Sequence, residues 1–142
     1  MSVHMSLKKY SHNVGGNFRH IVLVTKYRYR MFGKFEQKNL IEACLRKMSY
    51  KHKLKIRVMK VMPEHVHMLV TFPHGMNDSK ALMLLKGGSA YFFFKNAPRN
   101  RLRLPRGHLW SAGGCALTVG YNDISTVEKY IINQVDKGYP NL

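Results

Sequence analysis

The segment MPEHVHMLVTF (residues 62–72) constrains the fold most, because its alternation predicts a strand that carries polar chemistry on one face. Side chains alternate between the two faces of a strand, so His65 and His67 point the same way. Val66 and Met68 point the other way, where they can be buried. The segment therefore predicts a half-buried strand with an apolar face toward a core and two imidazoles side by side on the opposite face. Two imidazoles at this spacing can share one metal ion or one phosphate.

The charge of the chain indicates the kind of partner it binds. Its 142 residues include 24 Lys and Arg against seven Asp and Glu, which gives a net charge of +17 and a pI near 10.2. Such an excess of cations favours a polyanionic partner. The basic residues are spread through the chain rather than confined to one amphipathic helix, so nucleic acid fits better than a membrane surface. The composition therefore predicts a nucleic-acid-binding protein.

Composition also argues against several other classes of protein. Hydrophobic residues make up 45% of the chain, which is enough for a core and excludes a disordered chain. No apolar run approaches the roughly 20 residues that span a bilayer, and the N-terminus lacks the pattern of a signal peptide. Cys44 and Cys115 lie far apart without metal-type spacing, as expected of reduced thiols in a cytosolic protein. We therefore expect a cytoplasmic protein that binds nucleic acid, with no membrane partner.

The chain is expected to form one domain over residues 1–142, with residues 1–18 as a loosely ordered extension. Hydrophobic periodicity predicts strands at 19–29, 53–62, 65–72 and 115–119, and helices at 35–52, 80–95 and from 125 to about 136. Gly87-Gly88 weakens the second helix and suggests a break there, and the third helix begins with a capping box from Ser125 to Glu128. The order β-α-β-β-α-β-α predicts an α+β fold, ferredoxin-like or RRM-like. Its helices are expected to pack on one face of a single antiparallel sheet.

Two basic segments are candidates for the nucleic-acid surface. In KYRYR (residues 26–30) cations alternate with tyrosines, a pattern that can supply phosphate contacts and stacking platforms for bases. The loop at 97–107 is rich in arginine and proline. The candidate contacts in these segments are Lys26, Arg28, Arg30, Arg99, Arg101 and Arg103. Lys86, beside Gly87-Gly88, is a further candidate, although this stretch fits a mere helix break equally well. The alternative interpretation is that these cations only keep an exposed strand end and a charged loop soluble.

The predicted C-terminal helix carries two further candidate site residues. Tyr130 and Gln134 are four residues apart and would be neighbours on one helix surface, beside an apolar stripe that faces the sheet. Two imidazoles and an amide oxygen can ligate a divalent ion, which would polarise a phosphodiester for attack by a phenolate. The remaining histidines show no partner pattern and are assigned no role; they are His4, His12, His20, His52, His74 and His108.

Several motifs together resemble one known family. They occur in the family's order as VTKYRY (24–29), MPEHVH (62–67), LKGGSA (85–90), HLWS (108–111), TVG (118–120) and KYIINQ (129–134). The chain resembles the TnpA transposases of small insertion sequences, the single-tyrosine branch of the HUH nucleases. It departs from the usual pattern at Glu64, where the family more often has Asp, and at residues 114–117, which lack an expected aromatic residue.

The resemblance implies a role for each candidate residue. His65 and His67 would be metal ligands, Gln134 the third ligand and Tyr130 the nucleophile, with Mg²⁺ or Mn²⁺ as the cofactor. The protein would bind single-stranded DNA with hairpin ends, and cut and rejoin it through a 5′-phosphotyrosine. It would act as a homodimer in which the tyrosine helix of one subunit can serve the histidines of the other.

Two other interpretations of the sequence stay open. A domesticated relative would nick and join repeated palindromes with the same chemistry, without mobilising an element. A non-catalytic basic α+β module would only bind RNA or single-stranded DNA.

Overall fold

The computed structural model describes residues 17–134, and the statements below refer to that part of the chain. Its strands are β1 (Phe18–Val24), β2 (Lys55–Met62), β3 (His65–Thr71) and β4 (Cys115–Thr118). Its α-helices are α2 (Phe35–Lys51), α3 (Asp78–Asn96) and α4 (Ile124–Ile132). Short 3-10 helices are η1 (Lys26–Arg28), η2 (Pro98–Arg103) and η3 (Tyr121–Asp123). Within these described residues, no helix is long and apolar enough to cross a membrane.

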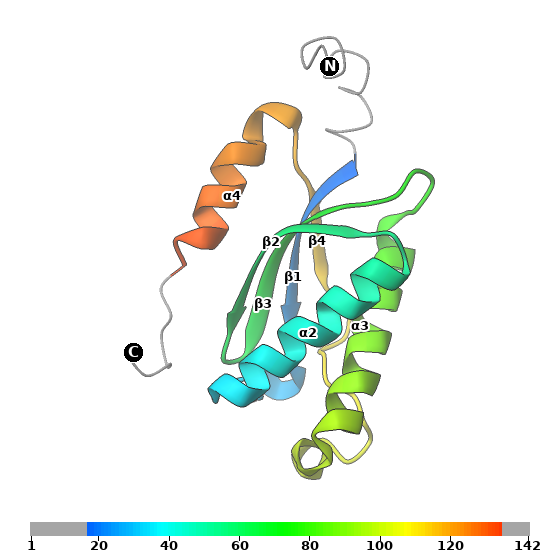
Figure 1. Cartoon of the computed structure of the whole chain (residues 1–142), viewed down its shortest axis with the longest axis vertical. Coiled ribbons are helices and arrows are strands. Elements are labelled where there is room, and N and C mark those ends of the chain that lie inside the picture. Colours follow the sequence, from blue (N-terminus) through cyan, green and yellow to red (C-terminus); the bar gives the residue numbers. More distant parts are fainter. Residues whose placement is uncertain (1–16, 135–142) are drawn as a thin grey trace.

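The strands form a single antiparallel sheet in the order β2-β3-β1-β4 (Figure 1). The predicted α+β fold class and the predicted order of elements are confirmed. The β2–β3 hairpin turns tightly at Pro63 and Glu64, since Met62 already pairs with His65. Proline suits this position because a turn does not need its missing backbone donor.

The two faces of the sheet bury different sets of side chains. Toward α2 and α3 lies the larger core, which includes Ile21, Leu23, Val66, Met68, Ile41, Leu45, Leu85 and Phe93. Toward α4 lies a smaller cluster of Phe18, Leu69, Val119, Ile124 and Ile131. The helices α2 and α3 share one face as expected, but α4 departs from that expectation and covers the opposite face. The reason is the fully buried Ile131, whose apolar partners on the sheet, Phe18 and Leu69, point away from α2 and α3.

The first strand is shorter than predicted. It ends at Val24, and the segment after it turns through η1, where Tyr27 and Arg28 have left-handed φ angles of 58° and 53°. The buried Thr25 holds this turn. Its backbone N–H donates to the carbonyl oxygen of Glu64 at 2.9 Å, and its hydroxyl donates to that of Tyr29 at 2.7 Å. These fixed contacts offset backbone strain of about 1–3 kcal/mol at each left-handed residue.

The last helix also differs from its predicted bounds. It begins at Ile124, after Asp123, and no capping box forms. Glu128 does not reach back to cap the helix because its carboxylate binds Arg57 of β2, with Nε and Oε2 2.6 Å apart. The helix ends at Ile132, earlier than expected. The predicted continuation past residue 134 lies outside the described residues, as do residues 1–16 of the extension predicted over residues 1–18. The end of that extension is ordered instead, because Phe18 is buried and begins β1.

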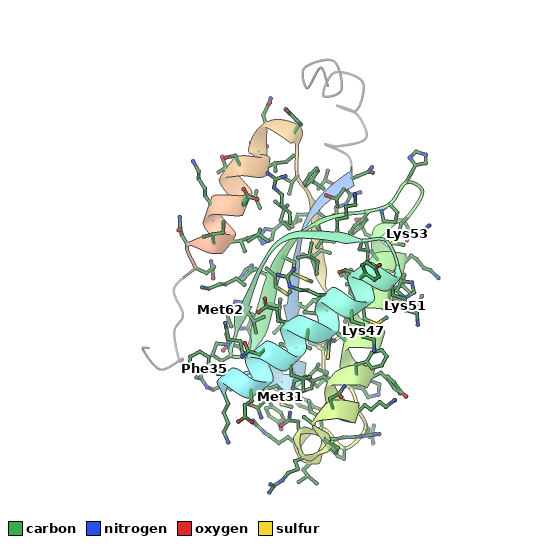
Figure 2. The ribbon with its side chains drawn as sticks, viewed as in Figure 1. Met31, Phe35, Lys47, Lys51, Lys53 and Met62 are labelled. Carbon is green, nitrogen blue, oxygen red and sulfur yellow. The ribbon has the colours of Figure 1, made fainter. Side chains whose placement is uncertain are left out.

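The middle helix α3 runs unbroken through Gly87-Gly88, contrary to the break that the sequence suggested. Gly88 faces α2, and a Cβ built there would lie 2.1 Å from Cε of Met48. Gly87 faces open space. The second glycine therefore permits close packing of two helices, which offsets its weak helix propensity. Lys51 is exposed at the C-terminal end of α2, and Lys53 is exposed in the turn to β2 (Figure 2). Lys47 lies over the Phe92 ring of α3, with Nζ 3.8 Å from the ring centroid.

This contact predicts opposite effects for neighbouring substitutions. Gly87→Ala is expected to raise the free energy of unfolding by about 0.5–1 kcal/mol, because alanine favours the helix and meets nothing. Gly88→Ala is expected to be less stable than Gly87→Ala by about 1–3 kcal/mol, because Met48 must leave its place. Urea denaturation measures both values, and an equal gain in the two variants would contradict the close α2–α3 contact.

Candidate active site and nucleic-acid surface

The two predicted histidines, His65 and His67, lie at the start of β3 and share the side of the strand that faces α4. Their ring centroids are 4.8 Å apart and the rings are nearly perpendicular, with an interplanar angle of 82°. Both side chains are half-buried. The predicted adjacency of His65 and His67 therefore appears in the structure, and their shared face is the one that α4 covers.

Each of these imidazoles has a polar partner at its Nδ1 atom. His65 Nδ1 lies 2.7 Å from Oε1 of Glu64, and His67 Nδ1 lies 3.2 Å from Nε2 of His20. The rings of His20 and His67 are also stacked, with centroids 5.4 Å apart. In both catalytic candidates the Nδ1 atom is thus engaged within the protein, which leaves the Nε2 atom for a ligand.

His20 is a site residue that the sequence reasoning missed. It comes from β1, where it pairs with Leu69, while its neighbour Val22 pairs with His67. This register sets His20 on the same face as the histidine pair and diagonally next to His67. The only signal in the sequence was a histidine inside an otherwise apolar strand, and its meaning depends on the β1–β3 register.

Tyr130 comes to the same place from α4. Its ring centroid lies 6.1 Å from those of both His20 and His67, with the rings edge-on, and its side chain is 55% exposed. The structure therefore brings the predicted nucleophile against the histidines of its own chain. The exposed phenol leaves room for a large substrate.

Gln134 is placed differently from the prediction. It lies two residues beyond the end of α4, half-buried, and its backbone N–H donates to the carbonyl oxygen of Ile131 at 3.3 Å. Tyr130 and Gln134 therefore do not share one helical surface. Within residues 17–134, no hydrogen bond joins the Gln134 side chain to the histidines. In that same part of the chain, no three His, Cys, Asp or Glu side chains converge as a metal site.

The electrostatics favour the uncharged forms of the half-buried His67 and His20 imidazoles. Burial lowers the pKa of His67 to about 4, and repulsion from His65 and His20 adds to the effect. Burial also lowers the pKa of His20. A neutral imidazole has a free lone pair, so His67 is able to act as a metal ligand at neutral pH.

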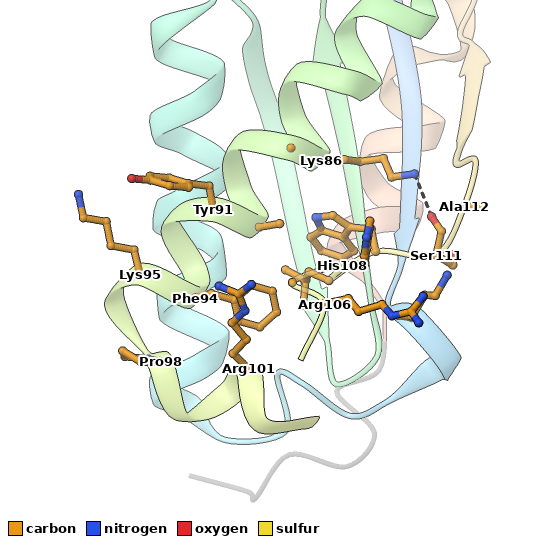
Figure 3. A pocket seen from close by; sticks show the side chains of 16 residues that line it. Lys86, Tyr91, Phe94, Lys95, Pro98, Arg101, Arg106, His108, Ser111 and Ala112 are labelled. Carbon is orange, nitrogen blue, oxygen red and sulfur yellow. Dashed lines mark hydrogen bonds between the residues drawn. The ribbon is translucent and has the colours of Figure 1, made fainter. Parts of the chain in front are cut away.

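A basic cavity lies on the α3 side of the sheet, between α3 and residues 106–112 (Figure 3). Its volume is about 700 Å³, and its apolar wall includes Phe94 and Trp110. The cations that line it are Lys26, Lys86, Lys95, Arg101 and Arg106. None of the described residues that line it is acidic. Trp110 is a buried wall residue rather than a free stacking platform, since its indole N–H donates to the Ser89 hydroxyl at 2.9 Å.

The predicted DNA contacts gather around this end of the molecule. Lys26 and Arg101 line the basic cavity, and Arg28 and Arg99 are exposed beside it on η1 and η2. Arg30 and Arg103 line a neighbouring pocket of about 360 Å³. The guanidinium of Arg103 lies 4.3 Å from the centroid of the Tyr29 ring, a cation–π contact.

Lys86 has a structural contact that the sequence did not indicate. Its ammonium donates to the carbonyl oxygens of Ser111, at 2.9 Å, and of Gly113. Burial lowers the pKa of Lys86, and the nearby charge of Lys26 adds to the effect. Lys86 therefore stabilises the segment that leads into β4. Its ammonium uses two hydrogen bonds for this contact, which leaves only part of its donors for a ligand in the cavity.

Together, the histidine pair, the tyrosine helix and the cationic surface define a class of small α+β proteins that process DNA. Residues 15–134 match the family described as "Transposase IS200 like", and the chain belongs to this family. It is 32% identical over 118 residues to the ISDra2 transposase TnpA of Deinococcus radiodurans. That match covers 83% of this chain and 84% of the relative.

Two solved structures share the fold. A protein of Deinococcus radiodurans R1, described as a transposase in its crystal structure, superposes with a TM-score of 0.67 at 28% identity. This match covers 82% of the present chain and 89% of that protein. A REP-associated tyrosine transposase bound to a REP hairpin has a TM-score of 0.57 at 15% identity, covering 84% and 66% of the two chains. The predicted family is thus confirmed.

The low pKa of His67 predicts how stability depends on pH. His67 stays neutral in the folded protein but gains a proton near its ordinary pKa of about 6.5 in the unfolded chain. The unfolded state therefore binds more protons between pH 6.5 and 4, so the free energy of unfolding falls as the pH drops through this range. His67→Asn is expected to reduce the loss between pH 7 and pH 5 by about 1 kcal/mol, a value discounted for partial exposure. Urea denaturation at the two pH values measures the loss, and an unchanged loss in this variant would contradict the lowered pKa.

Proposed function

We propose that this protein is a single-strand DNA transposase that cuts and rejoins DNA through Tyr130. The observation that carries the proposal is the position of Tyr130, whose ring lies 6.1 Å from that of His67 on one face of the sheet. A nucleophile, two imidazoles with engaged Nδ1 atoms and a cationic surface are the parts that this chemistry needs. Membership of the transposase family supports the same function.

The proposed reaction conserves the phosphodiester bond energy. The Tyr130 oxygen attacks the scissile phosphorus, forms a 5′-phosphotyrosine and releases a free 3′-hydroxyl. A second 3′-hydroxyl then attacks the phosphotyrosine, which restores the phenol and joins the strands without ATP. The pKa of a phenol is ordinarily near 10, so a nearby positive charge must help to form the phenolate.

The residues present suit a divalent cofactor, Mg²⁺ or Mn²⁺. His65 and His67 would hold the ion through Nε2, with Gln134, which follows the tyrosine helix, as the proposed third ligand. These neutral ligands leave positions for water and phosphate oxygens, which such ions prefer. When bound, the ion supplies Lewis-acid polarisation of the scissile phosphate.

The proposed substrate is single-stranded DNA with hairpin ends, bound by a homodimer. The cations around η1, η2 and the basic cavity support a DNA partner, because no carboxylate among the described lining residues opposes them. The fold-related REP-associated tyrosine transposase binds a REP hairpin, and we propose the same class of ligand here. The contacts of Tyr130 with its own chain support attack in cis, and the domesticated nickase stays as the alternative role.

The first prediction concerns the nucleophile. With hairpin-ended single-stranded DNA and Mn²⁺, the protein should form a covalent adduct that survives denaturing electrophoresis. Tyr130→Phe should reduce the adduct at least about 100-fold while hairpin binding persists, because only the attacking oxygen is lost. Tyr121→Phe is the matched control, since Tyr121 is also exposed and lies just before α4. Persistence of the adduct in Tyr130→Phe would rule out this nucleophile, and no adduct in any variant would favour a binding-only module.

The second prediction concerns the subunit that supplies the tyrosine. Mixed dimers of Tyr130→Phe and His67→Ala subunits contain one intact set of residues only across the two chains. If attack occurs in cis, these mixtures should form no more adduct than the separate variants. Recovery of the adduct in the mixture would instead establish attack in trans.

The third prediction concerns the cationic surface. Arg101→Ala and Arg106→Ala should weaken hairpin binding, and each should lower the salt slope of the binding constant by about one if it removes a phosphate contact. Lys51→Ala is the matched control, because it removes an exposed cation at the C-terminal end of α2, away from the basic cavity (Figure 2). Fluorescence anisotropy at several salt concentrations measures these slopes. Equal effects in all three variants would indicate a diffuse charge effect instead of a local surface.

A further inference from the structure

The hydrogen bonds at Nδ1 determine which nitrogen of each imidazole carries the proton. A neutral imidazole has one N–H donor and one lone pair, and the partner of one nitrogen fixes the state of the other. A carboxylate of ionised Glu64 only accepts hydrogen bonds, so the 2.7 Å contact places the proton of His65 on Nδ1. Its Nε2 atom is then left with a free lone pair.

The contact between His67 and His20 has two possible directions. If His20 Nε2 donated, the His67 proton would sit on Nε2 and block a metal ion there. If His67 Nδ1 donates, His20 Nε2 is the acceptor and the lone pair of His67 Nε2 is free. Only the second direction gives His67 the same Nδ1–H tautomer as His65. Both rings then present an Nε2 lone pair to one ligand.

We propose that His20 and Glu64 are positioning residues that hold His67 and His65 in the Nδ1–H tautomer and so present both Nε2 lone pairs to the metal. This inference rests on the proposed function, because the metal ion gives the tautomers their role. The contacts from which it is argued do not depend on that function. It stands on the 3.2 Å and 2.7 Å contacts and on the stacking of His20 against His67. Partners of this kind fix the ring orientation as well as the tautomer of metal-ligating histidines.

His20 is well placed for this role. The register of β1 against β3 fixes its backbone, and its ring stacks on the His67 ring at 5.4 Å. The Tyr130 ring lies 6.1 Å from both rings, so His67 contacts a strand neighbour and the tyrosine helix. A purely apolar packing residue at position 20 would fill the same space without accepting a hydrogen bond.

Nitrogen-15 NMR of the metal-free protein tests the tautomers directly. In protein labelled with ¹⁵N-histidine, two-bond proton–nitrogen correlations above pH 7 should show His65 and His67 as Nδ1–H tautomers. His20→Leu should shift His67 to the Nε2–H form that predominates in free histidine, with His65 unchanged. Glu64→Leu should shift His65 to the Nε2–H form and leave the tautomer of His67 unchanged. His20→Gln retains an acceptor at the end of the side chain and should preserve the tautomer of His67.

The outcomes separate this inference from the proposed function. An Nε2–H tautomer of His67 in the unsubstituted protein would overturn the role of His20, and this result needs no variant to fold. An unchanged tautomer in folded His20→Leu would overturn it as well.

Metal affinity gives a second readout that does not depend on cleavage. With Tyr130→Phe protein bound to hairpin DNA, titration of Mn²⁺ followed by electron paramagnetic resonance should give affinity about 10- to 100-fold weaker when His20→Leu is added. With His20→Gln in place of His20→Leu, most of the Mn²⁺ affinity should be retained. An equal loss of affinity in both variants would reduce His20 to a packing role. Correct tautomers without Mn²⁺ binding in any variant would instead contradict the proposed metal function.

Discussion

The antiparallel pairing of β1 with β3 is the interaction on which the rest of the structure depends. Its register sets Val24 against His65 and Val22 against His67, and brings His20 beside the histidine pair. The same pairing sends Ile21 and Val66 to the opposite face, where α2 and α3 bury them. A shift of one residue would exchange the two faces and bury the imidazoles in the larger core.

This division puts the proposed catalytic residues and the basic cavity on different sides of the sheet. Figure 1 shows α4 and α3 on opposite faces of the sheet. The histidines and Tyr130 share the α4 face, while the basic cavity lies on the α3 side. Thr25 connects the two regions, because its contacts fix both the turn before β3 and the cationic segment at η1. These contacts join the end of the sheet that carries His65 to the segment whose Lys26 lines the basic cavity.

Much of this arrangement follows from the sequence, and the exceptions have physical reasons. Strict alternation around His65 and His67 was enough to predict a shared polar face, and periodicity gave the order of the elements. His20 was missed because a strand does not reveal its cross-strand register. The start of α4 was misjudged because Glu128, expected in an N-terminal capping box, binds Arg57 on a distant strand. The glycines of α3 suggested a break because the close approach of Met48 is a tertiary contact.

In the proposed site, Glu64 and His20 occupy the Nδ1 atoms, so that a metal ion would bind the Nε2 atoms of His65 and His67. The most direct test is a crystal structure of the protein with hairpin DNA and Mn²⁺, using anomalous scattering to locate the ion. We expect one anomalous peak at coordination distance from both Nε2 atoms, with both Nδ1 contacts retained. A peak coordinated by Nδ1, or a peak away from these two histidines, would contradict it.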